Sequence, residues 1–309
     1  MTEPCDLSAV AARRMIGARQ LSPVELLDSC LARTAAVDHA VNAMVALDTD
    51  RARAAAKAAE AAVMKGDKLG PLHGLPIGIK DLEETAGLRT TFGSPLFADH
   101  VPAEDQAMVA NLRAAGAIVM GKTNTPEFGA GANTRNAVYG ATGNAFDPSK
   151  SAAGSSGGSA VALATGMVPL ASGSDMGGSL RNPAAFNGIF GFRPSAGLVP
   201  SESRGLGWSN LSVLGPMARD ATDTALLLSA MADDDARDPL SYTLHGRAVR
   251  RGDRDLFPPM GLDLGRLRVA ATADFGFAPT EKHIREVFAD RVAKLEPLFG
   301  RVEQATPDC

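Results

Sequence analysis

The spacing of apolar positions predicts two helices near the start of the chain. Residues 22–25 read Ser-Pro-Val-Glu, which is a capping box with proline at the first helical position. The apolar side chains that follow repeat at helical spacing on one face: Val24, Leu27 and Leu31. Residues 50–64 are rich in alanine, which has the best helix propensity, and they predict a second helix. We therefore expect residues 1–65 to form an N-terminal helical region.

From residue 66 onward, helical patterns alternate with short apolar runs. Residues 75–81 are apolar and bounded by Gly and Pro, which predicts a strand or its exit, and residues 117–120 predict a buried strand. Helical spacing over 105–115 and over 220–231 predicts helices. This order of helix, short loop and strand is typical of α/β proteins, so we expect an α/β core over residues 66–309.

The segment 142–201 is dense in Gly and Ser and carries few charges. A flexible linker has a similar composition. Because apolar residues such as Val161, Leu163 and Phe192 are interleaved through it, we interpret this segment as a packed, loop-rich centre. Residues 238–260 are polar and contain proline, which predicts a surface excursion.

The end of the chain predicts a strand, a helix and a strand over residues 267–271, 280–299 and 301–305. The helix is amphipathic, and its predicted inner face holds Ile284, Val287, Phe288, Val292 and Leu295. Inner strands of a parallel sheet need neighbours at both edges. We therefore expect residues 1–309 to be a fragment of a longer polypeptide or to be completed by a partner chain, and to be aggregation-prone and inactive alone.

Composition and charge exclude several classes of partner. Hydrophobic residues make up 45% of the 309 positions, enough for a sizeable core. The formal net charge is −4 and aromatic residues make up 5%, so the chain has neither the basic footprint nor the stacking surfaces of a nucleic-acid-binding protein. The most apolar stretch, 160–171, is interrupted by Gly166 and Pro169 and is shorter than the roughly 20 residues that span a bilayer. No apolar signal segment is visible in residues 1–15, so we expect a cytoplasmic protein without membrane contact.

The cysteines carry little chemistry. Cys5, Cys30 and Cys309 lie far apart and in no metal-ligand spacing, which favours free thiols over a disulfide. We also interpret the acidic run 233–235 as a solvated helix end rather than a metal site. No metal site is expected.

Three segments carry candidate chemistry: 76–81, 154–160 and 173–181. The last two contain Gly-Gly-Ser, in which paired glycines let backbone N–H groups converge into a concavity beside a hydroxyl. Such a hydroxyl can attack a carbonyl while the N–H groups stabilise the oxyanion. A tight turn without a ligand is the alternative for a single Gly-Gly-Ser. A phosphate loop is disfavoured because neither segment has the Gly-x-x-x-x-Gly-Lys-Ser/Thr pattern.

A serine nucleophile needs a base. The chain has five histidines, and none lies in these segments or in a recognisable triad motif. Lysine is the alternative base, provided that burial keeps it neutral. Lys80 follows the apolar run 76–79, so a strand end can deliver it to the interior. For any lysine taken alone, a surface position at a strand terminus is the more common interpretation.

Together these segments resemble the signature of the amidase signature family. The chain matches the family's Gly-Ser-Ser-Gly-Gly-Ser at 154–159 and its Asp-x-Gly-Gly-Ser-x-Arg-x-Pro at 175–183. The family's upstream lysine segment is matched by 76–81, at the expected separation. Residues 123–128 and 191–195 extend the resemblance over most of the chain. Family members usually continue beyond the point at which this chain stops.

The resemblance implies a role for each matched position. Ser179 would be the acylated nucleophile, Ser155 a bridging serine that follows a cis peptide bond, and Lys80 the ultimate base. The backbone N–H groups of four residues would form the oxyanion hole: Met176, Gly177, Gly178 and Ser179. Three further residues would support the site: Ser156, Asp175 and Arg181. For Asp175 and Arg181 a structural ion pair is an equally good interpretation.

The resemblance also implies a fold and an activity. We expect a single α/β amidase signature domain over residues 1–309, with a mixed sheet flanked by helices on both faces and a catalytic core over 66–309. The expected reaction is hydrolysis of a small carboxylic amide to acid and ammonia or amine through a Ser179 acyl-enzyme, without a metal or organic cofactor. Two alternatives remain open, an amidotransferase subunit that passes ammonia to a partner and a non-catalytic scaffold. A homo-oligomer is also possible under this reading.

Overall fold

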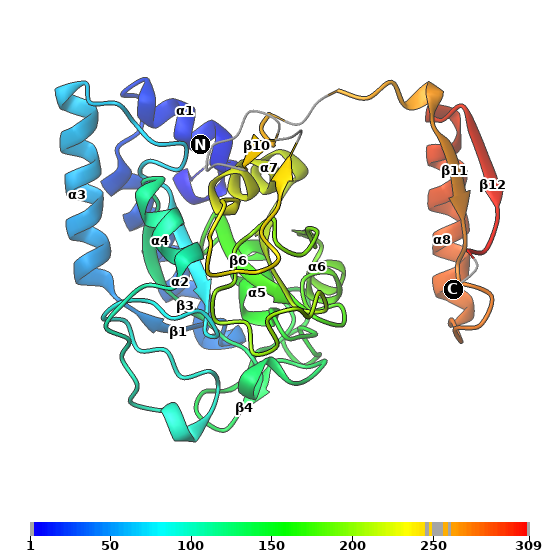
Figure 1. The fold of residues 1–309 in the computed structure, drawn as a ribbon, viewed down its shortest axis with the longest axis horizontal. Helices are drawn as coiled ribbons and strands as arrows, with labels where there is room; N and C mark the ends of the chain where they lie inside the picture. Colours follow the sequence, from blue (N-terminus) through cyan, green and yellow to red (C-terminus); the bar gives the residue numbers. More distant parts are fainter. Residues whose placement is uncertain (1–2, 245–246, 249–255, 259–260, 308–309) are drawn as a thin grey trace. The chain divides into compact units, whose positions relative to one another are not determined.

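A six-stranded mixed sheet organises the larger part of the chain in the computed structural model (Figure 1). The structure describes residues 3–244, 247–248, 256–258 and 261–307. The chain groups into two compact units, Met1–Pro259 and Met260–Cys309, and each is described by itself.

The N-terminal region supplies three helices and one strand of the larger unit. The helices are α1 (Ala9–Gly17), α2 (Pro23–Val41) and α3 (Thr49–Lys65). The predicted capping box is confirmed, because the Ser22 side chain accepts from the start of α2 and the Glu25 carboxylate accepts from the Ser22 N–H at 2.9 Å. The region is not purely helical, since β1 (Met44–Leu47) pairs antiparallel with β3 at the edge of the sheet.

The sheet mixes parallel and antiparallel pairs. β2 (Pro76–Lys80) pairs in parallel with β3 (Ile118–Thr123) on one side and with β6 (Leu170–Asp175) on the other. β8 (Val213–Ala218) runs antiparallel to both β6 and β7 (Phe190–Gly191). In spatial order the strands are β1, β3, β2, β6, β8 and β7.

Helices cover both faces of this sheet. Every residue of β2, β3 and β8 is buried, and successive side chains of a strand point to opposite faces. α5 (Gly157–Ala164) packs against β2, β3, β6 and β8, while α7 (Ala221–Met231) packs against β6, β7 and β8. α4 (Ala107–Ala114) contacts α7, and α6 (Arg181–Asn187) contacts α5. The predicted α/β class, with a mixed sheet flanked by helices, is confirmed.

The centre of the chain is more regular than its composition predicts. The segment expected to be loop-rich contains α5, β6 and α6. Small residues are required there for close packing rather than for flexibility: a Cβ on Gly158 would lie 2.2 Å from the backbone nitrogen of Asn124. β8 was also missed, because Gly215 and Pro216 in its middle resemble a turn.

The smaller unit is a strand–helix–strand motif, as predicted. β11 (Arg268–Ala271) pairs in parallel with β12 (Arg301–Gln304), and α8 (Lys282–Leu295) connects them. The predicted inner face of α8 is only partly covered. Phe288 and Val292 are half-buried, whereas three of its apolar side chains remain about half exposed: Ile284, Val287 and Leu295, at 48, 52 and 49%.

The remaining elements are short. Two hairpins pair β4 (Arg135–Asn136) with β5 (Gly140–Ala141) and β9 (Thr243–Leu244) with β10 (Arg247–Ala248). The 3₁₀ helices are Pro4–Asp6, Pro95–Phe97, Glu127–Gly129, Leu264–Arg266 and Glu296–Leu298. Much of the predicted excursion 238–260 and all of Cys309 lie outside the described residues. Among the residues that are described, Cys5 and Cys30 are buried free thiols, and no helix is long and apolar enough to cross a bilayer.

Candidate active site

The three parallel strands bring their carboxyl ends to one edge of the sheet. β2 ends at Lys80, β3 at Thr123 and β6 at Asp175. In open α/β sheets the crevice beyond the carboxyl ends of the strands is the usual place for a ligand. The segment that follows β6 carries Ser179, so two of the predicted catalytic residues are delivered to this edge by neighbouring strands.

Lys80 is fully buried and surrounded by serine hydroxyls. Its Nζ donates to Ser155 Oγ at 2.7 Å, to Ser156 Oγ at 2.9 Å and to Ser174 Oγ at 2.8 Å. Three acceptors match the three donors of an ammonium group. Within the described chain, no carboxylate forms a salt bridge with Lys80. The surface-lysine interpretation of Lys80 is therefore excluded.

Burial lowers the pKa of Lys80, because the ammonium form loses its hydration. The nearby carboxylates of Glu83 and Asp175 act in the opposite direction and raise the pKa. The net effect of these opposing contributions is a lowered pKa, so Lys80 gives up its proton more readily than a lysine in water.

The serine pair is fixed by its backbone. The Gly154–Ser155 peptide bond is cis, as the family resemblance implies. Ser155 and Ser156 are both buried. The Thr134 side chain holds the turn around Ser155. Its Oγ1 donates to the Ala153 carbonyl at 2.9 Å and accepts from the Gly157 N–H at 3.0 Å.

Ser179 lies next to this pair. Its carbonyl oxygen accepts from the Ser156 N–H at 3.3 Å, and the residue is half-buried. Its hydroxyl makes no hydrogen bond to any described residue, so the Ser155–Ser179 link of the implied relay is not formed in this structure. Lys80 is thus hydrogen-bonded directly to Ser155, whereas Ser179 contacts the serine pair through its backbone carbonyl.

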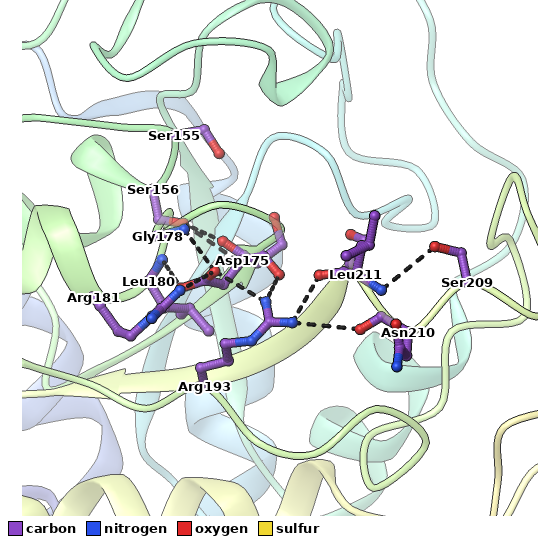
Figure 2. A network of polar contacts seen from close by, with 12 residues as sticks. Ser155, Ser156, Asp175, Gly178, Leu180, Arg181, Arg193, Ser209, Asn210 and Leu211 are labelled. Carbon is purple, nitrogen blue, oxygen red and sulfur yellow. Dashed lines mark hydrogen bonds and ion pairs between the residues drawn. The ribbon is translucent and has the colours of Figure 1, made fainter. Parts of the chain in front are cut away.

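Asp175 anchors the loop that carries Ser179 (Figure 2). Arg181 binds both of its carboxylate oxygens at 3.0 Å, and Arg193 binds Oδ1 at 3.0 Å and also the Asp175 carbonyl. The N–H groups of Gly178 and Leu180 donate to the same carboxylate at 2.8 and 3.1 Å. Burial alone would raise the pKa of Asp175, but the hydrogen bonds from Arg181, Gly178 and Leu180 outweigh it and hold the pKa below its usual range. Asp175 and Arg181 thus form an ion pair in the structure.

The turn after β6 leaves three backbone donors free of partners among the described residues. Gly178 has φ +114°, a conformation that favours glycine, and its N–H points to Asp175. The N–H groups of Met176, Gly177 and Ser179 donate to no acceptor within the described residues. Of the four backbone N–H groups predicted to form the oxyanion hole, three are therefore available to a ligand. The fourth, that of Gly178, donates to the Asp175 carboxylate.

Sequence reasoning missed four residues that contact these groups. Ser174 supplies the third hydroxyl on Lys80, and Arg193 donates to Asp175. Glu83 and Lys122 are buried, and the Lys122 ammonium donates to the Glu83 backbone carbonyl. Two signals were present in the sequence: Ser174 directly precedes Asp175, and Glu83 follows Lys80 by one helical turn's spacing. Lys122 was missed because the predicted strand stopped at residue 120, whereas β3 continues to Thr123.

One cluster among the described residues has the composition of a metal site: Glu3, Cys5 and Asp6. Arg33 pairs with Glu3 at 2.9 Å and with Asp6 at 3.1 Å, so both carboxylates already share one guanidinium as their partner. The cluster lies at the N-terminus and contains none of the candidate catalytic residues.

The chain is similar to known amidases in sequence and in structure. The Amidase family model matches residues 25–308. An acylamidase of Rhodococcus erythropolis is 37% identical over 97% of the chain, and a glutamyl-tRNA(Gln) amidotransferase subunit of Chloroflexus aurantiacus is 43% identical over 78% of it. A solved bacterial aryl acylamidase of the amidase signature enzymes superposes with a TM-score of 0.87 at 30% identity, over 97% of this chain and 61% of that one. The chain spans 62% and 50% of the lengths of the two sequence relatives.

Proposed function

This chain belongs to the amidase signature family, and we propose on that premise that it hydrolyses a small linear carboxylic amide through a Ser179 acyl-enzyme. The observation that carries the proposal is the buried contact of Lys80 Nζ with Ser155 Oγ at 2.7 Å. A buried lysine with a lowered pKa, hydrogen-bonded to a serine, has the chemistry of a general base.

The first half of the reaction forms the acyl-enzyme. Neutral Lys80 accepts the Ser155 hydroxyl proton while Ser155 accepts the proton of Ser179. Ser179 Oγ attacks the amide carbonyl carbon, and the carbonyl oxygen becomes an oxyanion. The proton held on Lys80 returns through Ser155 to the amide nitrogen, the C–N bond breaks, and ammonia or an amine leaves.

The second half regenerates the enzyme. Water attacks the acyl carbon and transfers a proton through Ser155 to Lys80. That proton returns through Ser155 to Ser179 Oγ as the ester bond breaks and the acid leaves. In both halves the oxyanion would be stabilised by the N–H groups of Met176, Gly177 and Ser179. The Asp175 anchor supports this proposal because it fixes the turn from which those donors project.

Rotation of the Ser179 side chain is the one rearrangement that the mechanism requires. Ser179 is half-buried and its hydroxyl has no partner among the described residues, so reorientation toward Ser155 breaks no hydrogen bond within them. A bound substrate would favour this rotamer by placing its carbonyl against the turn.

The test is hydrolysis by the whole chain of a panel of aliphatic, aryl and amino-acid amides, followed as ammonia or amine release. We expect turnover of at least one class and none after Ser179→Ala. A matched control is Ser149→Ala, which changes an exposed serine and should keep full activity. Turnover that persists in Ser179→Ala would contradict the proposal.

An amidotransferase activity is the second candidate, because the glutamyl-tRNA(Gln) amidotransferase relative is 43% identical over 241 residues. In that case glutamine would be the preferred amide, and the released ammonia would be transferred rather than lost. Glutamine hydrolysis far above that of simple amides, stimulated by an added partner chain, would support this candidate. A cytoplasmic location, a homo-oligomer and a completing chain stay predictions of the sequence.

A further inference from the structure

Glu83 is a buried carboxyl group that the proposed relay does not use. It is 1% exposed, and its Oε1 has no hydrogen-bond partner among the described residues. Its Oε2 accepts a single hydrogen bond, from Ser172 Oγ at 3.3 Å. A buried carboxylate with so few donors is unfavourable, and it calls for a reason beyond packing.

Glu83 is tied to the strand end that carries Lys80. Ser172 Oγ, which donates to the Glu83 carboxylate, accepts from the Lys80 backbone N–H at 2.9 Å. The Glu83 N–H in turn donates to the Lys80 carbonyl at 3.1 Å. These contacts tie the Glu83 carboxylate, through the Ser172 hydroxyl, to the backbone of Lys80, and no salt bridge joins the two side chains among the described residues.

The other charged groups around Lys80 already have partners. Asp175, at the end of β6, is paired with Arg181 and Arg193. Asp81 accepts from the Thr91 hydroxyl at 2.5 Å and from its N–H at 3.1 Å. These contacts leave Glu83 as the buried carboxylate near Lys80 whose charge is least compensated by hydrogen bonds.

Lys122, on the adjacent strand β3, does not neutralise Glu83 by contact. Its Nζ donates to the Glu83 carbonyl and to Thr85 Oγ1 at 3.0 Å, not to the carboxylate. Lys122 also feels the charges of three other acidic residues: Asp81, Asp105 and Glu84.

We propose that Glu83 is a positioning residue whose carboxylate supplies the counter-charge to Lys80 and thereby sets the pH at which Lys80 becomes a base. This inference rests on the proposed role of Lys80. When Lys80 takes up the serine proton, a positive charge appears in a buried site, and the Glu83 carboxylate stabilises it. When Lys80 is neutral, Glu83 is the group left without a counter-ion and holds a proton more strongly.

The pKa directions agree with this arrangement. Burial raises the pKa of Glu83, the Lys80 and Lys122 charges offset only part of this rise, and the net pKa is raised to about 7. Burial lowers the pKa of Lys80, and the largest opposing influence is the Glu83 charge. Each group therefore makes the charged form of the other less unfavourable.

The first experiment removes the charge with Glu83→Gln and records kcat and KM against pH for the full chain. Without the carboxylate the ammonium form of Lys80 is less favourable, so the acidic limb should move to lower pH by about one unit. The plateau kcat should fall about tenfold, because a base of lower pKa is weaker, while KM stays unchanged.

Two variants separate charge from packing. Glu84→Gln removes an exposed carboxylate one position further on and should leave the profile in place. Among the described residues, this carboxylate contacts the His100 ring at 3.3 Å and no other side chain. Glu83→Asp keeps the charge and should hold the acidic limb near that of the unaltered chain. An equal shift in Glu83→Asp and Glu83→Gln would overturn the charge argument.

A second experiment needs no substitution at Glu83. With ¹³C-labelled glutamate and lysine, the Glu83 carboxyl resonance should show a step at the pH at which Lys80 titrates, because each group feels the charge of the other. Lys80→Met should abolish that step. A Glu83 resonance with no step at the Lys80 midpoint overturns the inference, even if Glu83→Gln does not fold.

Different experimental results would contradict this inference and the proposed function. If Lys80→Met keeps full activity, the proposed relay itself is wrong. If Lys80→Met is inactive but Glu83→Gln has the unaltered pH profile, the relay stands and Glu83 has no part in it.

Discussion

The two buried charges at the ends of neighbouring parallel strands have opposite surroundings. Lys80, at the end of β2, contacts three neutral hydroxyls and no carboxylate among the described residues. Asp175, at the end of β6, contacts two guanidinium groups and two backbone amides (Figure 2). Both side chains are fully buried, so the difference lies in their partners and not in their exposure.

This difference separates a group that can change its charge from one that cannot. Hydroxyls can donate or accept, so they can serve both the ammonium and the amine form of Lys80. Guanidinium groups only donate and stay protonated, so Asp175 is held as a carboxylate. This difference supports the proposal that the residue at the end of β2 transfers protons, while Asp175 at the end of β6 fixes backbone geometry.

Substitution of Lys80 should have the largest effect. Lys80→Met removes the base, and general-base contributions of about 10²–10⁴ in rate predict a loss of that order in kcat. Lys80→Arg should not restore activity, because guanidinium does not lose its proton. The matched control is Lys122→Met, which removes another fully buried lysine from the adjacent strand. Thermal melts report whether all three variants fold. If Lys122→Met is as inactive as Lys80→Met, the loss of activity is not specific to Lys80.

The pH dependence of kcat/KM should identify Lys80 as the base without any substitution. Lys80 acts as a base only when it is neutral, so kcat/KM should fall about tenfold per pH unit below its pKa and level off above it. The midpoint should lie below the pKa of about 10.4 of an ordinary lysine, because burial disfavours the ammonium. Replacing each of the five histidines in turn should leave the midpoint in place. A midpoint that moves with one histidine would assign the base elsewhere.

Substitution at Asp175 should reduce stability as well as activity. Asp175→Asn removes the charge that Arg181 and Arg193 share, and loss of a buried ion-pair partner costs about 3–5 kcal/mol. Urea unfolding measures this cost. Because the folded pKa is lowered, the contribution of Asp175 is complete above its unfolded pKa and is lost only as the pH falls through the lower folded value. The control is Asp235→Asn, whose partner Arg237 is largely exposed, and its expected cost is below about 1 kcal/mol.

The smallest effect should come from Arg181→Lys. The side chain of Arg181 is 56% exposed, and Arg193 remains on the same carboxylate. Lysine keeps the charge but loses the two-pronged contact, so we expect a cost of about 1 kcal/mol or less. A loss as large as that of Asp175→Asn would mean that Arg181 alone holds the turn.

The fold could be predicted where periodicity or capping gives a local signal. The capping box at Ser22, strand β2 and the β11–α8–β12 motif were identified this way. β6 and β8 were missed because their small residues, glycine and proline carry no strand signal. They are strands because both neighbours and the covering helices bury them.

The candidate site, like the fold, could be predicted only where the signal is local in sequence. The family resemblance indicated Lys80, Ser155 and Ser179 because motifs are contiguous in sequence. It did not indicate Ser174 as the third acceptor on Lys80, or the use of the Gly178 amide by Asp175. Those contacts depend on how β2 and β6 are placed side by side, which no short motif encodes.

The site of acylation tests the proposed relay most directly. The full chain is treated with a substrate-like acylating inhibitor, digested, and the modified residue is located by mass spectrometry. We expect one adduct on Ser179, absent after Ser179→Ala and strongly slowed after Lys80→Met. An adduct on Ser155 or Ser159, or one on Ser179 that forms equally fast without Lys80, would contradict the relay.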